Sequence, residues 1–179
     1  MQAEMYKIGS MGKGFVAIMA RPSLEVNAAA SIINIARLGI QQVVSLLEPN
    51  EALHLGLDAE GEEVKANNME FISFPIPDMG LPNSVEGFAQ LSRQIFEQVN
   101  GGVNTLIHCH AGIGRSGLMA AGILLHCDMD PLQAFAYASK MRGIRVPETH
   151  EQEQWLHKHY ASIVEYDKSQ YQNFDAIRA

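Results

Sequence analysis

Residues 105–117 read Thr-Leu-Ile-His-Cys-His-Ala-Gly-Ile-Gly-Arg-Ser-Gly, and the rest of the chain is organised around this stretch. The residues that lead up to Cys109 predict a buried strand. From Leu118 to Leu125 the positions are apolar on nearly every helical face, which predicts a buried helix that begins at Ser116. The segment from Cys109 to Arg115 must then turn from the strand into the helix. We therefore predict a strand, a short arch and a buried helix.

The arch has the residue types of an anion-binding loop. Gly112 and Gly114 stand where the backbone has to turn without steric penalty. Such a turn directs successive N–H groups inward, and the helix that follows adds the positive end of its dipole. Of its residues, His110 and Ile113 are expected to face the rim of the cleft. The sequence predicts a phosphate-binding arch that consists, before Arg115, of His110, Ala111, Gly112, Ile113 and Gly114.

Three side chains give this anion site a chemistry. A helix N-terminus and a nearby arginine favour thiolate over thiol, so Cys109 is predicted to be a nucleophile. Arg115 can offer a planar fork to two phosphoryl oxygens, which a lysine cannot do. Ser116 can donate a hydroxyl hydrogen bond to the sulfur and help it leave. The alternative is a buried, inert thiol, which the matching positions of the glycines, the arginine and the serine disfavour.

The pattern His108-Cys109, five residues, then Arg115-Ser116 resembles the signature of the cysteine-dependent protein tyrosine and dual-specificity phosphatases. The surroundings, from about residue 37 to residue 159, are most similar to the kinase-associated phosphatase group. The resemblance implies hydrolysis of phosphate esters through a phosphocysteine, with no cofactor. No metal is expected either, because His108, Cys109 and His110 have no further Cys or His pair at ligand spacing.

A second informative stretch, residues 74–82, contains three prolines and a glycine around Asp78. These residues forbid regular structure and predict a stiff-sided loop that can hinge over the site. Displacing an alkoxide or phenolate from phosphorus requires a proton, so Asp78 is predicted to be the general acid. The resembled phosphatases carry a comparable aspartate some thirty residues before the cysteine. The alternatives are that Asp78 only makes an Asx-turn, or that Asp58 is the acid instead.

Two further residues have supporting roles with open alternatives. His108 adjoins the nucleophile, but a strand reverses faces at every residue, so its side chain is expected to point into the core. There it would hydrogen-bond and hold the arch; the alternative is that it relays a proton. Gln152 is a weak candidate for positioning the hydrolytic water, a role that the resemblance implies for a glutamine after the arch. The capping-box pattern from Thr149 to Gln152 explains it equally well.

The order of the remaining elements predicts an α/β fold: a three-layer sandwich whose central, mostly parallel sheet has helices on both faces. The strands and helices expected outside residues 105–125 are strands at 6–8, 15–20, 42–47 and 69–74, a helix from Ser23 to Leu38, two weak helical segments within 51–68, and helices at about 84–99, 131–142 and 150–163.

Length and composition fit one catalytic domain over residues 1–179, with a core at about 5–163 and a polar tail at 164–179. The formal charge of −7 argues against nucleic acid or an anionic membrane as partner. Cys127 is expected on the same helix as Ser116, about 16 Å along its axis, which excludes a disulfide with Cys109. Free thiols favour a cytoplasmic location. The oligomeric state stays open.

We therefore expect a phosphatase acting on phosphotyrosine, and also on phosphoserine or phosphothreonine, in a phosphoprotein or phosphopeptide. A phosphoinositide phosphatase would be expected to carry lysines in the arch, and this arch has none. An RNA 5′-triphosphatase fits the acidic composition poorly. A phosphate-binding module without turnover is the non-enzyme alternative, which Cys109 and Asp78 disfavour. The basic turn 140–147 is compatible either with a peptide-binding rim or with plain solvation.

Overall fold

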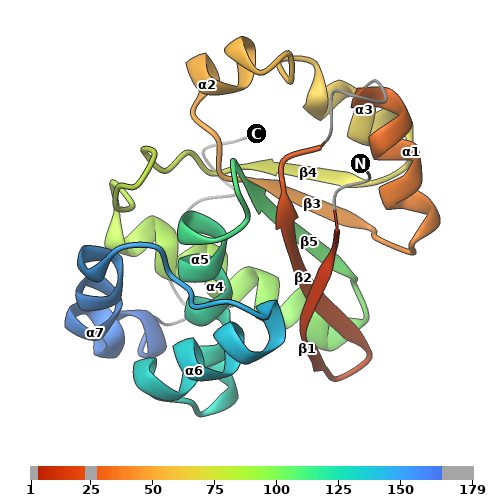
Figure 1. Ribbon diagram of the computed structural model, residues 1–179. Coiled ribbons are helices and arrows are strands. Elements are labelled where there is room, and N and C mark those ends of the chain that lie inside the picture. The colour runs from red at the N-terminus through yellow and green to blue at the C-terminus, as the bar shows by residue number, and fades with distance from the viewer. Residues whose placement is uncertain (1–3, 23–27, 167–179) are drawn as a thin grey trace, which may run out of the picture.

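A computed structural model describes residues 4–22 and 28–166 of the chain. Strands and helices alternate through most of its length (Figure 1). The elements are β1 (Tyr6–Met11), β2 (Gly14–Ala20), α1 (Ala28–Arg37), β3 (Gln42–Ser45), α2 (Pro49–His54), α3 (Glu60–Ala66), β4 (Glu70–Ser73), α4 (Val85–Gly101), β5 (Thr105–Cys109), α5 (Gly114–Leu124), the 3-10 turn η1 (Leu125–Cys127), α6 (Pro131–Arg142) and α7 (His150–Val164).

The strands form one five-stranded sheet in the order β1-β2-β5-β3-β4. Only β1 runs antiparallel to its neighbour, and the other three pairings are parallel. The central strand β5 is buried along its whole length, and Thr105 is in register with Val16 of β2 on one side and Gln42 of β3 on the other. The prediction of a mostly parallel sheet is confirmed. The strand order places the carboxyl end of β5 at the centre of one sheet edge.

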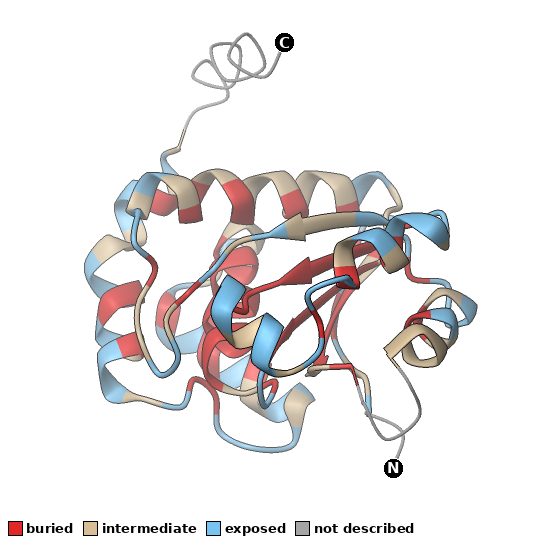
Figure 2. Ribbon diagram, turned by 90° about the horizontal axis from the view of Figure 1, so that it is seen from above, coloured by how far each residue is buried: buried red, intermediate tan, exposed pale blue. Residues whose placement is uncertain are grey.

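Helices cover both faces of the sheet, as predicted (Figures 1 and 2). On one face, Val16, Val44 and Ile107 pack with apolar side chains of α4, α5, α6 and α7. On the other face, the residues next in sequence, such as Ala17 and Val43, pack with α1 and α3. This alternation follows from the period of two along a strand. The result is a three-layer sandwich, with every residue of α5 buried.

Local capping signals fix where the long helices begin and end. Ser84 accepts a hydrogen bond from the N–H of Gly87 at 2.9 Å, and Gly102 caps the carboxyl end of α4 in the left-handed conformation. The N-termini of α6 and α7 each carry a reciprocal capping box, led by Asp130 and by Thr149. These predicted helix starts are therefore confirmed.

Some expected boundaries were wrong. The buried helix begins at Gly114, two residues earlier than predicted, and ends at Leu124, so Cys127 lies in η1 and not on the same regular helix. Cys109 and Cys127 are nevertheless both free thiols. The predicted cap Ser23 lies outside the described residues, as does the tail beyond residue 166. None of the helices within residues 4–22 and 28–166 combines the length and apolar character needed to cross a bilayer.

Candidate active site

The arch lies at the carboxyl edge of the central strand. β5 ends at Cys109 and α5 begins at Gly114, so four residues connect the innermost strand to the most buried helix. In Figure 1 this connection lies directly above the end of α5 and beside the ends of β2 and β3. The positive end of the α5 dipole is therefore directed at the arch. An edge of this kind is where parallel α/β sheets bind ligands.

The conformation of the arch depends on Gly112. Its φ is +67°, and a Cβ there would lie 2.4 Å from backbone atoms of Met19, so no other residue fits. The N–H of Gly112 donates to Sγ of Cys109 at 3.3 Å. Cys109 is only 2% exposed, which places the thiol on the floor of the arch with a backbone donor aimed at it.

The structure gives a different reason for the glycine at position 114 from the one predicted. It is the first residue of α5 and does not adopt a positive φ. A Cβ at Gly114 would lie 3.0 Å from Oε2 of Glu148 and 3.2 Å from Oε1 of Gln152. The glycine therefore favours close approach of Glu148 and of the first turn of α7, and it is not used for the turn of the arch.

Arg115 folds back from α5 and is 2% exposed. Its Nη1 donates to Glu51 Oε2 at 2.7 Å and to the carbonyl of Ile76 at 3.1 Å, and its Nη2 donates to Glu51 Oε1 at 2.8 Å. Burial acts to lower the pKa of Arg115, but the hydrogen bond with Glu51 and the negative charges of Cys109, Glu51 and Asp78 outweigh it and raise that pKa above its ordinary value. The guanidinium is thus a fixed cation.

Glu51 is a site residue that sequence reasoning missed. The hydrogen bond with Arg115 is the main cause that holds the pKa of Glu51 below its ordinary value, against the opposing effect of burial. Glu51 also occupies the N3 position of α2, where its Oε2 accepts from the N–H of Glu48 at 3.3 Å. In the sequence, the only feature that marks Glu51 is its place three residues after Glu48 at the start of a helix, and this indicates a local capping role.

Asp78 lies at the mouth of the arch. Its Oδ1 accepts from Arg115 Nη2 at 2.9 Å, while 66% of its side chain is exposed. The loop is anchored just before it, where the N–H of Ile76 donates to the carbonyl of Leu46 at 3.1 Å. Asp58, the alternative acid, lies instead in a separate groove along α2, α3 and β4. The structure therefore places Asp78, and not Asp58, in the same cavity as Cys109.

A cavity of about 100 Å³ opens above Cys109. Arch residues His110 and Ala111 contribute to its wall, a position that was expected for His110. Ile113 does not: it is half-buried and packs against the hydrophobic core, so the expectation that it faces the rim was wrong. The lining consists of Asp78, Met79, Cys109, His110, Ala111, Gly114, Arg115 and Glu148.

Ser116 follows the arginine into the first turn of α5. It is fully buried, and its Oγ has no hydrogen-bond partner among the described residues. The expected hydrogen bond to the sulfur of Cys109 is therefore not formed in this structure. A hydroxyl whose proton is uncommitted can still turn toward a charge that develops nearby.

His108 points into the core, as its position in the strand predicted. Its Nε2 lies 2.7 Å from Oε1 of Glu60, a close contact rather than a well-aligned hydrogen bond, and both side chains are at most 2% exposed. The carbonyl of His108 accepts from the N–H of Leu46 at 3.0 Å. His108 therefore joins β5 to α3 and to the end of β3, away from the cavity. Glu60 was not predicted.

Gln152 does not reach the cavity and is fully buried. Its Oε1 accepts from the N–H of Thr149 at 3.3 Å, and its Nε2 donates to the carbonyl of Gly80 at 3.0 Å. Both ends of the amide are thus committed. Of the two readings left open by the sequence, the geometry favours the capping box, and it adds a tether from α7 to the loop that carries Asp78.

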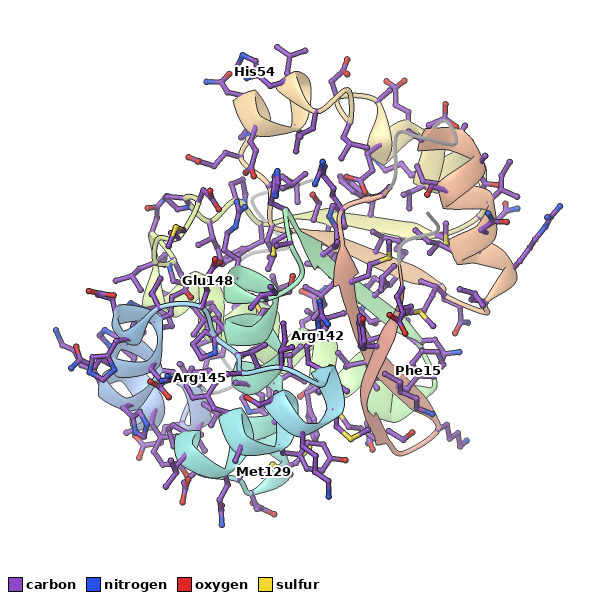
Figure 3. The ribbon with its side chains drawn as sticks, in the orientation of Figure 1. Phe15, His54, Met129, Arg142, Arg145 and Glu148 are labelled. Carbon is purple, nitrogen blue, oxygen red and sulfur yellow. The ribbon has the colours of Figure 1, made fainter. Side chains whose placement is uncertain are left out.

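The basic turn supports the arch from outside (Figure 3). Nε of Arg142 donates to the carbonyl of Gly112 at 2.9 Å, and its guanidinium lies 3.8 Å from the ring centroid of Tyr6. Arg145 is 75% exposed and pairs with Glu153 at 2.9 Å. Of these two arginines, only Arg142 therefore contacts the arch. Among the described residues, no three metal-ligating side chains gather into a possible metal site.

Comparison with known families identifies the family of this chain. The family described as "PTP-SAK: Swiss Army Knife protein, DSP-PTPase phosphatase domain" matches residues 7–166. The chain belongs to this family. The DSP-PTPase domain thus includes every described strand and helix except the first residue of β1. The resemblance to the dual-specificity phosphatases is confirmed.

Individual relatives agree with the family. Cyclin-dependent kinase inhibitor 3 of Sus scrofa is 34% identical over 86 residues, which cover 47% of this chain and 40% of that protein. Its counterpart in Rattus norvegicus is 32% identical over 94 residues, 51% of this chain and 44% of that protein. The matched part is therefore less than half the length of these curated relatives.

Solved structures share the fold of this DSP-PTPase domain over most of its length. A crystal structure of kinase-associated phosphatase, with serine in place of its catalytic cysteine, superposes with a TM-score of 0.80 at 19% identity, covering 92% of this chain and 97% of the other. The structure of Tk-PTP in its active form gives a TM-score of 0.71 at 29% identity, covering 88% and 95%. The fold is therefore that of the dual-specificity phosphatases.

Proposed function

We propose that this protein hydrolyses phosphate monoesters on proteins through a phosphocysteine. The observation that carries the proposal is that three side chains line one cavity: Cys109 lies on its floor, Arg115 in its wall and Asp78 at its mouth. A nucleophile, a cation for the phosphoryl oxygens and a proton donor are the groups that displacement at phosphorus needs. Membership of the DSP-PTPase family supports the same chemistry.

In the first step the thiolate of Cys109 attacks phosphorus. The S–P bond forms as the bond to the ester oxygen breaks, and Asp78 gives its proton to that leaving oxygen. The phosphoryl oxygens are held by the N–H groups of the arch and by Arg115, whose Nε makes no hydrogen bond to a described residue. Asp78 must leave Nη2 of Arg115 as substrate enters, which its exposed position allows.

In the second step water attacks the phosphocysteine. The new O–P bond forms, the S–P bond breaks, and the electron pair returns to Cys109 as thiolate. Asp78, now a carboxylate, accepts the water's proton. The buried hydroxyl of Ser116 donates to the departing sulfur, a role supported by the absence of another partner for Oγ among the described residues.

Phosphotyrosine is the better substrate in this proposal, and phosphoserine and phosphothreonine are also accepted. The small cavity, with Met79 at its lining and 57% exposed, supports a shallow site. A phosphorylated protein is the proposed partner, in keeping with relatives whose names refer to kinases. Two free cysteines support a reducing compartment, for which we propose the cytoplasm.

The decisive experiment measures p-nitrophenyl phosphate turnover by the wild-type chain and by Cys109→Ser. We expect turnover only in the wild type, a phosphorylated intermediate on Cys109 after rapid quenching, and phosphopeptide binding by both proteins. The matched control is Cys127→Ser, which changes the thiol of η1 and should leave turnover unchanged. Wild-type protein that binds phosphopeptide without turnover would support the binding-module alternative instead.

A further inference from the structure

We propose that Glu148 is a second catalytic carboxylate, which accepts a hydrogen bond from the attacking water and holds it in line with the S–P bond. This inference rests on the proposed function, because it concerns the second step of that reaction. Glu148 precedes α7 in a segment that sequence analysis did not connect with catalysis. In Figure 3 it lies between the amino end of α5 and the loop that carries Asp78.

The position of the carboxylate is the first observation. Glu148 lines the cavity together with Cys109 and Arg115. Its Oε2 is 3.0 Å from the point that a Cβ on Gly114 would occupy, so it lies against the last residue of the phosphate-binding segment. A Cβ there would make a tighter contact than most side chains have, so Glu148 would have to shift by a few tenths of an ångström. The glycine at position 114 therefore lets Glu148 approach the arch closely.

The direction of the reaction is the second observation. The sulfur of Cys109 lies on the cavity floor, so the ester oxygen must depart toward the mouth, opposite to the sulfur. Water in the second step must approach phosphorus from that same side. A group that orients the water must therefore lie at the mouth. Asp78 and Glu148 are the two carboxylates in the lining.

The third observation concerns the hydrogen bonds that the neighbouring side chains already make. Gln152, the residue expected to position water, uses its amide on Thr149 and Gly80. Asp78 must take the proton and has one oxygen on Arg115. For Glu148, no hydrogen bond or ion pair to another described residue competes for its oxygens. It is the free acceptor at the place where the water must stand.

The two carboxylates thus have different tasks in the second step. Water donates one hydrogen bond to Glu148, which fixes its oxygen on the axis through phosphorus and sulfur. As the O–P bond forms, the water's other proton passes to Asp78 and the S–P bond breaks to return the thiolate. No further reactant is required. In the first step Glu148 has no such task, since the leaving oxygen receives its proton from Asp78.

The test is pre-steady-state kinetics of p-nitrophenyl phosphate with Glu148→Ala. We expect an initial burst approaching one p-nitrophenolate per active site at the wild-type rate, followed by a steady state slowed about 10- to 100-fold. KM should fall with kcat, because the phosphocysteine accumulates and because a carboxylate that repels the phosphate has been removed. Glu148→Gln keeps an oxygen acceptor and should turn over faster than Glu148→Ala.

The matched control is Glu151→Ala, which removes the same charge three residues away on an exposed side chain that does not line the cavity. It should keep wild-type kcat and show no burst. Wild-type kcat without a burst in Glu148→Ala, or a loss confined to the burst rate, would overturn the role of Glu148 while leaving the phosphocysteine mechanism intact. Failure of the wild type to form a phosphocysteine would instead overturn the proposed function itself.

Discussion

Glu51 and Arg115, which are 64 residues apart in sequence, form a two-point ion pair with Nη2–Oε1 at 2.8 Å and Nη1–Oε2 at 2.7 Å. The pair fixes the plane of the guanidinium, which is the property that bidentate recognition of phosphate requires. Because Glu51 belongs to α2, this short helix is part of the active-site support. This geometry leaves Nε, together with the Nη2 hydrogen that Asp78 gives up when substrate enters, for two phosphoryl oxygens.

Glu51→Ala should therefore impair the site without touching the nucleophile. We expect kcat/KM for phosphopeptides to fall about tenfold, or ~1.4 kcal/mol of transition-state stabilisation. Stability should also fall by about 1–3 kcal/mol, since a buried donor loses its partner. Steady-state kinetics and urea unfolding measure the two effects. Glu62→Ala, an exposed change on the neighbouring helix α3, is the control. Unaltered kcat/KM in Glu51→Ala would show that Arg115 is held adequately by Ile76 and Asp78.

Asp78→Asn tests the general acid. Removal of the proton donor should slow substrates with poor leaving groups most, by about 10²–10⁴-fold, and activated aryl phosphates least. The alkaline limb of the pH–rate profile should flatten. A series of aryl phosphates of increasing leaving-group pKa provides the measurement, with Asp58→Asn as the control. Equal loss across that series would assign another role to Asp78.

Gln152→Ala tests the tether between α7 and the acid loop. Loss of the bond to the carbonyl of Gly80 should let Asp78 drift, so turnover of phosphotyrosine peptides should fall about tenfold, or ~1.4 kcal/mol. Binding of phosphopeptide to the Cys109→Ser background should change little. The control is Gln154→Ala, whose amide contacts the exposed ring of His150 instead. If both glutamine variants behave alike, the effect belongs to helix stability.

The small volume of the cavity leads us to expect broad substrate specificity. A tyrosine-only pocket needs walls as long as the phenol ring, whereas this cavity measures about 100 Å³ and has the exposed Met79 in its lining. We expect phosphotyrosine peptides to be hydrolysed fastest and phosphothreonine peptides at a measurable rate. Initial rates over a varied peptide panel test this. Strict tyrosine specificity would contradict the shallow site but not the cysteine mechanism.

His126 should make stability depend on pH. Burial, aided by the charge of Arg93, lowers its pKa from 6.5 to about 4 in the folded protein. The unfolded chain then binds a proton at a pH where the folded protein does not, so the stability contribution is complete above pH 6.5 and is lost as pH falls toward 4. The loss should reach about 3 kcal/mol. Urea unfolding at several pH values measures it, and His126→Phe should remove this part of the slope. An unchanged slope in that variant would assign the acid sensitivity to other groups.

Local features of the sequence were sufficient to predict the position of the arch and most helix boundaries, and to propose Cys109 as the nucleophile. Cys109, Gly112 and Arg115 lie within seven consecutive residues, and the chemistry of an anion-binding turn before a helix depends on that short segment alone. The capping boxes of α6 and α7 are likewise local patterns, readable because a side chain and a backbone three residues away satisfy each other. Alternating and continuous apolar runs were enough to predict the strands of a mostly parallel sheet.

The tertiary structure alone decided which groups support that segment. Glu51 reaches Arg115 across 64 residues, Gln152 reaches Gly80 across 72, and Glu148 lies against Gly114. Nothing in the sequence separates these side chains from surface or capping residues, because long-range contacts depend on how helices and loops meet at the sheet edge. In the same way Ile113 proved to be a half-buried residue that packs against the core, since the direction of one arch side chain depends on a dihedral angle that packing sets.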